Sequence, residues 1–167
     1  RKAEDFWRAA LAEPPRPLDL YGPRGPSTHR SERVLADLGP ARTRRLRELA
    51  VSPGFRTFSP DQSVHGIFAT LLSAWLFRLG GNRRFAIGMP SHNRATPQFK
   101  RTAGLFLEVG PVVIDVEDDD TFVSLFKRTL PRVLLAMRFT RPGTTTAAHN
   151  RAYEVLLNFV NVSFAPF

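Results

Sequence analysis

Apolar side chains recur at helical spacing between residues 60 and 80, and this is the longest regular pattern in the chain. The positions are Val64, Ile67, Phe68, Leu71, Leu72, Trp75 and Leu79. Ser59 and Pro60 are typical of an N-cap and a first helical position, and Gly80-Gly81 is typical of a left-handed C-cap. The pattern predicts a helix that begins near Pro60 and buries the whole stripe.

Other helical and strand patterns alternate around this central helix. Further helices are predicted at residues 4–12, at 40–51 with Leu46 and Leu49 buried, and from the acidic run 117–120 through Met137, with a kink at Pro131. Strands are predicted at 32–38, 84–89, 111–116 and 153–163, and polar loops at 90–102 and 139–150. This alternation predicts an α/β sandwich with a mainly parallel or mixed sheet.

Length and composition match one globular domain. The chain has 167 residues, 43% of them hydrophobic, and no cysteine, which excludes disulfides, thiolate catalysis and cysteine metal sites. No apolar run approaches the roughly 18 residues of a transmembrane helix. The start, RKAEDFW, has neither a signal-peptide core nor an initiator Met, so we expect a cytoplasmic chain cut from something longer.

The charge distribution is strongly basic. The net charge is +9, and no Asp or Glu occurs between Gln62 and Leu107. That span carries Arg78, Arg83, Arg84, Arg94, Lys100 and Arg101. Two interpretations stay open: a solvated arginine-rich surface, or a docking face for an acidic partner or a nucleic acid. No nucleic-acid motif and no aromatic stacking platform accompanies the basic residues.

Candidate chemistry is sparse. The four histidines do not neighbour one another and lack metal-ligand spacing, so no metal site is predicted. His92 follows a predicted strand and stands beside Asn93 and Arg94, which suits either a hydrogen-bonded turn or a catalytic loop. His65 is expected to be a packed or capping residue, and His149 to be solvated. We interpret the acidic run 117–120 as complementing a helix dipole rather than binding a divalent metal.

Four segments, taken in order, carry a resemblance to a known family. They are FWRAALAEPPRPLDLYGPR, SPDQSVHGIFATLLSAWLFRLGGNRRFAIGMPSHNR, TAGLFLEVGPVVIDV and YEVLLNFVNVSFAPF. Together they resemble the condensation domains of non-ribosomal peptide synthetases, in the chloramphenicol-acetyltransferase-like superfamily. The matching motif positions are Gly88, Pro90, Asn93, Arg94, Gly104, Phe106, Asn158 and Phe159. Glu108 departs from the pattern, because the family has Asn there.

The resemblance implies part of a two-layer chloramphenicol-acetyltransferase-like α/β sandwich. Residues 1–26 would be the inter-lobe helix and Pro-rich connector, and 27–167 the N-terminal part of the C-terminal lobe. The family's HHxxxDG motif is absent from the sequence. The implied parent is an acyltransferase that forms an amide or ester bond in secondary-metabolite biosynthesis, whereas the chain alone is expected to be inactive and to hold no catalytic residue.

The resemblance also implies partners and a site. His92, Asn93, Arg94 and Asn158 would organise the site or line the tunnel between the lobes, and Arg94 could pair with a carboxylate of the other lobe. No cofactor is expected on the chain, because 4'-phosphopantetheine would arrive on acidic peptidyl or acyl carrier proteins. The remainder of the domain and neighbouring synthetase domains would be further partners, and a membrane would not. The alternatives are a non-catalytic carrier-docking domain and, less favoured, a basic nucleic-acid-associated protein.

Overall fold

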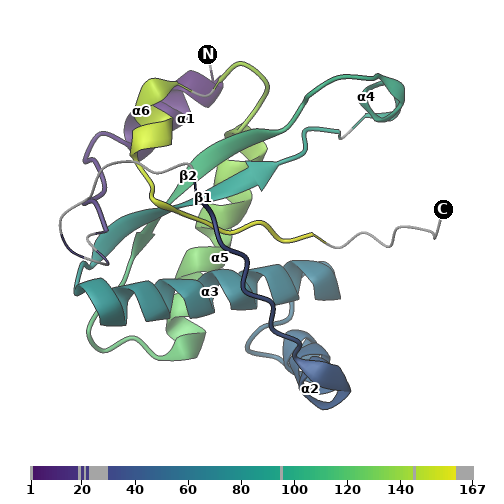
Figure 1. The fold of residues 1–167 in the computed structure, drawn as a ribbon, viewed down its shortest axis with the longest axis vertical. Coiled ribbons are helices and arrows are strands. Elements are labelled where there is room, and N and C mark those ends of the chain that lie inside the picture. Colours follow the sequence, from purple (N-terminus) through teal and green to yellow (C-terminus); the bar gives the residue numbers. More distant parts are fainter. Residues whose placement is uncertain are drawn as a thin grey trace.

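The computed structural model describes residues 2–18, 20, 22, 30–94, 96–144 and 146–160. The helices in this part are α1 (Lys2–Ala10), α2 (Gly39–Val51), α3 (Pro60–Gly80), α4 (Pro97–Arg101), α5 (Phe122–Phe139) and α6 (Ala147–Arg151). The strands are β1 (Arg84–Ser91), β2 (Glu108–Asp115) and β3 (Val155–Leu156). Figure 1 shows α3 and α5 packed together beside the sheet. It also shows α1 and α6 next to each other, at the end of the molecule away from α3.

The sheet is mixed, as predicted. Its strand order is β2-β1-β3, with β1 antiparallel to β2 and parallel to β3. The central strand β1 is buried from Phe85 to Met89. A strand covered on both faces reads as a continuous apolar run, which is why RFAIGM predicted it. Strand β2 begins at Glu108, three residues before the predicted start at Pro111, and therefore includes Gly110-Pro111.

The central helix α3 has the predicted ends. The Ser59 side chain accepts a hydrogen bond from the Gln62 backbone N–H at 3.2 Å, and Gly81 has a φ of 66°. The predicted buried stripe is wrong in part, since Leu71, Trp75 and Leu79 are 53%, 48% and 52% exposed. The buried face instead carries mostly small residues: Ser63, Gly66, Ile67, Ala69, Thr70, Ser73 and Leu76.

Small side chains on α3 let its backbone approach the neighbouring helix. A Cβ on Gly66 would lie 2.8 Å from the Phe126 ring and 3.0 Å from Leu130, both on α5. The buried hydroxyls of Thr70 and Ser73 donate to the Gly66 and Ala69 carbonyls at 2.8 and 2.7 Å. Because these polar groups are satisfied within the helix, their burial carries no large desolvation penalty.

The outer edge of β2 is closed by proline and arginine. Arg132 on α5 donates to the Val113 carbonyl at 3.1 Å, so this carbonyl points away from β1. Pro111 lies two residues earlier on the same side, where its missing N–H costs no ladder hydrogen bond. Arg128 donates to the Asp115 carbonyl at 3.4 Å. These contacts protect an otherwise free strand edge.

Helix α1 packs into the main core through Trp7. This side chain is 5% exposed, and its indole N–H donates to the Phe139 carbonyl at 3.1 Å. Phe6 stacks on Phe139 with ring centroids 4.5 Å apart. His149 on α6 meets Trp7 edge-on at 5.0 Å and is 7% exposed, so the prediction that it is solvated was wrong. The segment predicted as a loop contains α6, and this helix places His149 against Trp7.

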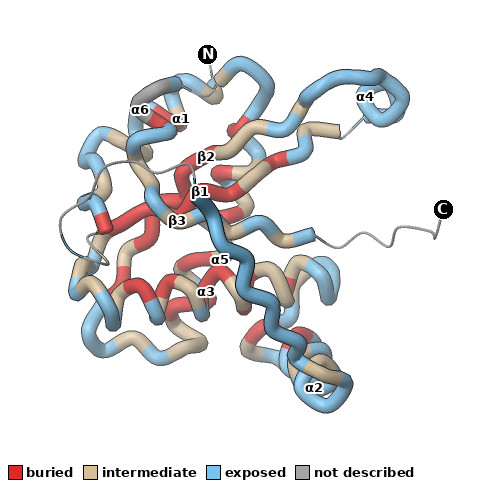
Figure 2. The backbone as a smooth tube through the Cα atoms, in the orientation of Figure 1, coloured by how far each residue is buried: buried red, intermediate tan, exposed pale blue. Residues whose placement is uncertain are grey.

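Several predicted elements differ from the structure. Residues 32–38 form no strand, and Figure 2 shows the segment that leads into α2 as exposed. Val34 and Leu35 are 91% and 86% exposed. The segment has strand-like residues, but it has no strand partner in the part of the chain described. The last strand is limited to Val155–Leu156, and residues 161–163 lie outside the described residues.

Local packing explains the smaller corrections. Leu49 is 37% exposed, so α2 buries Ala50 rather than both predicted leucines. Helix α4 interrupts the predicted loop 90–102, and Thr96 caps it by accepting from the Phe99 N–H at 3.2 Å. Helix α5 includes Pro131 between its ends, and the kink expected there stays a prediction.

Candidate functional site: the loop between β1 and β2

The candidate residues lie at the far end of the β1–β2 ribbon. In Figure 1, this ribbon extends beyond the main body and ends in the loop that carries α4. His92, Asn93 and Arg94 follow β1 directly, whereas Asn158 follows β3. The Leu157 N–H donates to the Gly88 carbonyl at 2.9 Å, which holds the start of the Asn158 segment beside β1. The side chain of Asn158 is exposed.

Asn93 joins the two arms of the loop. Its backbone has a φ of 53°, a left-handed conformation that Asn adopts more readily than most residues. Its side-chain amide donates to the Phe106 carbonyl at 3.0 Å and to the Ser91 carbonyl at 3.3 Å. The residue therefore makes the turn out of β1 and ties it to the strand that returns.

Arg94 holds the backbone of the same loop. Its Nη1 donates to the Phe99 and Thr102 carbonyls at 2.6 and 2.8 Å, and its Nη2 donates to the Gly104 carbonyl at 2.8 Å. Its guanidinium carbon lies 4.8 Å from the centroid of the Phe106 ring. A planar, permanently charged fork suits both the carbonyls and the ring.

The hydrogen-bond partners of Arg94 that are visible here are therefore backbone carbonyls. The pairing with a carboxylate of another lobe remains a prediction. The motif positions Gly104 and Phe106 are both joined to Arg94, so the structure unites two motifs that the sequence separates.

His92 and Glu108 complete the surroundings of the loop. The His92 side chain is exposed, which leaves it available to a partner. Glu108 accepts a hydrogen bond from the Gly143 N–H at 3.0 Å. Glu108, which replaces the family's Asn, thus links the start of β2 to the turn after α5. Sequence reasoning did not suggest this contact.

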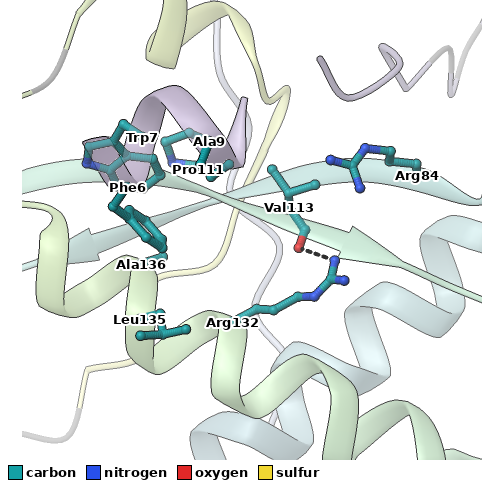
Figure 3. Close-up of a pocket in the computed structure, with 10 residues that line it drawn as sticks. Phe6, Trp7, Ala9, Arg84, Pro111, Val113, Arg132, Leu135 and Ala136 are labelled. Carbon is teal, nitrogen blue, oxygen red and sulfur yellow. Dashed lines mark hydrogen bonds between the residues drawn. The ribbon is translucent and has the colours of Figure 1, made fainter. Parts of the chain in front are cut away.

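A separate cavity of about 220 Å³ lies between α1, β2 and α5 (Figure 3). Phe6, Trp7, Leu135 and Ala136 form part of its apolar wall, and Arg84 and Arg132 add positive charge. The cavity lines β2 from Pro111 to Val113 and reaches Arg84, which lies opposite Asp115, whereas the candidate loop follows the Ser91–Glu108 pair at the other end of the ribbon.

Asp115 is shared by the two arginines of this cavity. Arg84 Nη1 donates to both of its carboxylate oxygens at 2.8 and 3.1 Å, and Arg132 also pairs with it. Burial raises the pKa of Asp115, but hydrogen bonds from Arg132 and Arg84 together with their charges bring the pKa below its ordinary value. Sequence reasoning missed this cluster because the strand register brings Arg84 to Asp115, and only the packing of α5 adds Arg132.

Two histidines are packed rather than exposed to a site. His65 stacks on Phe159 with centroids 5.2 Å apart and an interplanar angle of 9°. Burial lowers the pKa of His65 and also that of His149. The packed role predicted for His65 is confirmed. Among the described residues, neither histidine forms a hydrogen bond with the candidate loop.

The described residues include no group of three or more His, Asp or Glu side chains placed to bind a metal ion. Within the same residues, no helix combines the length and apolar character needed to span a membrane.

Comparison with known proteins identifies this fold. The first condensation domain of the calcium-dependent antibiotic synthetase superimposes with a TM-score of 0.72 at 18% identity, covering 97% of this chain and 36% of that one. A cyclization-docking bidomain from Sorangium cellulosum gives a TM-score of 0.69 at 22% identity, covering 94% and 33%. The fold is therefore part of the acyltransferase-like α/β sandwich, as the sequence predicted.

Sequence comparison supplies the family. The family described as "Condensation domain" matches residues 1–141, and the chain belongs to it. Malpinin synthetase of Mortierella alpina is 28% identical over 143 residues, and cyclo-acetoacetyl-L-tryptophan synthase of Aspergillus oryzae is 27% identical over 140. These matches cover 82% and 81% of this chain but only 2% and 4% of the relatives. The chain thus spans a small part of the curated relatives and about a third of the solved domains.

Proposed function

We propose that this chain is the connector and the first part of the C-terminal lobe of a condensation domain that joins carrier-bound thioesters through an amide or ester bond. The connector would be residues 1–26 and the lobe segment residues 27–167. The packing of Trp7 from α1 against α5 supports a connector that is fixed to this lobe.

The observation that carries the proposal is the construction of the β1–β2 loop. Arg94 bonds three backbone carbonyls and contacts Phe106, while Asn93 joins Ser91 to Phe106. These links give the exposed loop a defined shape. A loop held in this way suits one wall of a substrate tunnel, with His92 and Asn158 as further lining residues.

This wall would contribute positioning rather than proton transfer. Amide formation between two thioester-bound substrates gains much of its rate from holding the amine and the carbonyl in a reactive geometry. The sequence has no HHxxxDG motif, so the general base or amine-positioning histidine would come from the other lobe. Arg94 would then be a positioning residue that acts through the loop.

The proposed partners follow from the same reaction. Acidic peptidyl or acyl carrier domains would deliver substrates on their 4'-phosphopantetheine arms, and the neighbouring synthetase domains would complete the assembly. We place this reaction in the cytoplasm, where the synthetase would be made. A non-catalytic carrier-docking domain is the second candidate, favoured by the exposed arginines of α2.

The test uses the complete condensation domain with substitutions at Arg94. We expect Arg94→Ala to keep the fold and to lower the rate of condensation by about 100-fold, because a small displacement of reacting groups has this scale of effect. Arg94→Lys should be almost as slow, since an ammonium group cannot bond three carbonyls in the fork geometry. Single-turnover condensation with carrier-bound substrates measures the rate.

Arg101→Ala is the matched control, because Arg101 is an exposed arginine on α4 in the same loop. It should condense at the wild-type rate. Substrate affinity should change less than the rate in Arg94→Ala. Normal condensation by a folded Arg94→Ala domain would contradict the proposed role of the loop.

A further inference from the structure

Helix α2 presents a row of two arginines that lie between two leucines. Leu38, Arg42, Arg45 and Leu49 are spaced at i, i+4, i+7 and i+11, which aligns them along one helix face. Leu38, the N-cap residue, has helical backbone angles of −70° and −25°, so it continues the row. We call these four residues the Leu-Arg row. It is about 16 Å long, from a rise of about 1.5 Å per residue.

All four members of the Leu-Arg row are exposed. Leu38 and Leu49 are 45% and 37% exposed, and both arginines are exposed as well. The adjoining face of the helix carries Ala50, which is 1% exposed, and the partly buried Leu46, both in the small core with Phe55, Ile67 and Phe126. The anchoring of α2 therefore directs this row to solvent.

The charge of the row is not neutralised within the described part of the chain. Neither Arg42 nor Arg45 has an ion pair with a described residue, whereas Arg83, Arg84, Arg128 and Arg132 are paired with acidic groups. Glu48 is the single acidic residue of α2. Asp115 and Asp118 thus pair with two arginines of the acid-free span, and α2 adds further positive charge that has no acidic partner among the described residues.

We propose that the Leu-Arg row is a docking surface for a protein helix that carries two carboxylates between apolar residues. Two leucines flanking two arginines match an apolar and acidic helix face in both spacing and sign. A nucleic acid would gain from the charge, but it would leave the leucines without apolar partners, and no aromatic ring in the row offers base stacking.

The partner is identified through the proposed function, on which this inference rests. Acidic carrier domains are the proteins that the proposed reaction brings to the surface of a condensation domain. The row would bind the folded body of such a carrier, and the β1–β2 loop would meet its substrate arm. Docking and chemistry therefore use separate surfaces of this chain.

The experiment compares two double substitutions on the same helix. Arg42→Glu/Arg45→Glu reverses the charge of the row. Arg44→Glu/Arg47→Glu makes the same charge change at two exposed arginines outside the row. Binding of the parent synthetase's own holo carrier domain is measured by calorimetry for each variant. Circular dichroism and the melting temperature verify folding.

The row variant should lose affinity by about tenfold or more, as for central interface residues, and the control by less than about threefold. Leu38→Ser/Leu49→Ser should also weaken binding without changing the charge. Equal losses for both charge variants would overturn the proposal, because they would show a response to net charge alone. Tighter binding of a DNA duplex than of the carrier at equal salt would overturn it in favour of a nucleic acid.

A second readout separates this inference from the proposed function. The complete condensation domain is supplied either with carrier-bound substrates or with small soluble thioesters that need no carrier. We expect the row variant to condense carrier-bound substrates more slowly than the wild-type domain, and soluble thioesters at the wild-type rate. Equal activity of the row variant with both substrates would contradict docking, whereas no condensation by the wild-type domain with either would contradict the proposed function.

Discussion

Gly88 shows how one residue fixes the packing of the central strand. It lies in β1 opposite Pro111, and the ring of Tyr153 covers it so closely that any Cβ at this position would overlap the ring. Burial raises the pKa of Tyr153, consistent with a phenol enclosed by this contact. The glycine in the Gly-x-Pro motif is therefore explained by close approach of a side chain rather than by a turn.

We predict that Gly88→Ala destabilises the fold by about 1–3 kcal/mol, because the added methyl group forces Tyr153 or the strand to move. Urea unfolding measures the change. Gly54→Ala is the control, since its Cβ would contact Val123 at an ordinary 3.7 Å. The interpretation fails if both substitutions have the same small effect.

At the scale of elements, α3 shows that burial depends on packing as well as on hydrophobicity. Leu76 is fully buried at 0% exposure, while Leu79, three residues later, is 52% exposed. The buried face uses Gly66 and small hydroxyl residues so that α5 can approach closely. Leu71, Trp75 and Leu79 of the predicted stripe lie toward solvent instead.

This arrangement predicts unequal costs for two leucine truncations in one helix. Leu76→Ala should destabilise the fold by about 2–5 kcal/mol, because it leaves a cavity in the core. Leu79→Ala should cost less than about 1 kcal/mol, as its side chain is half in water already. Thermal and urea unfolding of the two variants provide the comparison, and similar losses would contradict the packing described.

Local signals in the sequence predicted where helices begin and end better than they predicted which elements pack or pair with one another. The caps Ser59 and Gly81 made the limits of α3 predictable, because capping depends on adjacent residues. Residues 32–38 were wrongly predicted as a strand, because a strand needs a partner that its own sequence cannot reveal. The candidate triplet His92-Asn93-Arg94 was visible from its position after β1, but the carbonyls that Arg94 bonds depend on how the loop folds back.

At the scale of the whole molecule, one carboxylate joins the sheet to a helix, and a second stabilises the start of α5. Asp115 links β1 and β2 to α5 through Arg84 and Arg132, and Asp120 receives hydrogen bonds from Arg128 at 2.8 and 2.9 Å. Burial raises the pKa of Asp120, but the Glu117 backbone N–H, Ser124 and Arg128 together bring the pKa below its ordinary value. The stability of the fold should therefore depend on both groups being ionised.

We predict that acid destabilises the fold through these groups. A carboxylate whose pKa is lower in the folded state stabilises fully above its unfolded pKa of about 4, and this stabilisation is lost as the pH falls from there toward the folded pKa. Asp115→Asn should cost about 1–2 kcal/mol at neutral pH, between the values for exposed and buried pairs. It should also flatten the decline in acid, measured by urea unfolding across pH.

Asp118→Asn is the matched control, because the side chains of the Arg83–Asp118 pair are 62% and 65% exposed. It should change stability by less than about 1 kcal/mol and leave the pH dependence intact. An Asp115→Asn variant with the wild-type slope in acid would show that another group controls the transition.

The exposed segment 30–38 has a consequence for how the molecule tolerates a broken chain. Arg30 and Arg33 are open to trypsin, while Trp7 before them and β1 after them are both in the core. Cleavage at these arginines would therefore give a nicked protein whose two pieces stay associated. Helix α1 would then behave as a bound peptide, and the covalent link to the lobe would be dispensable for holding it in place.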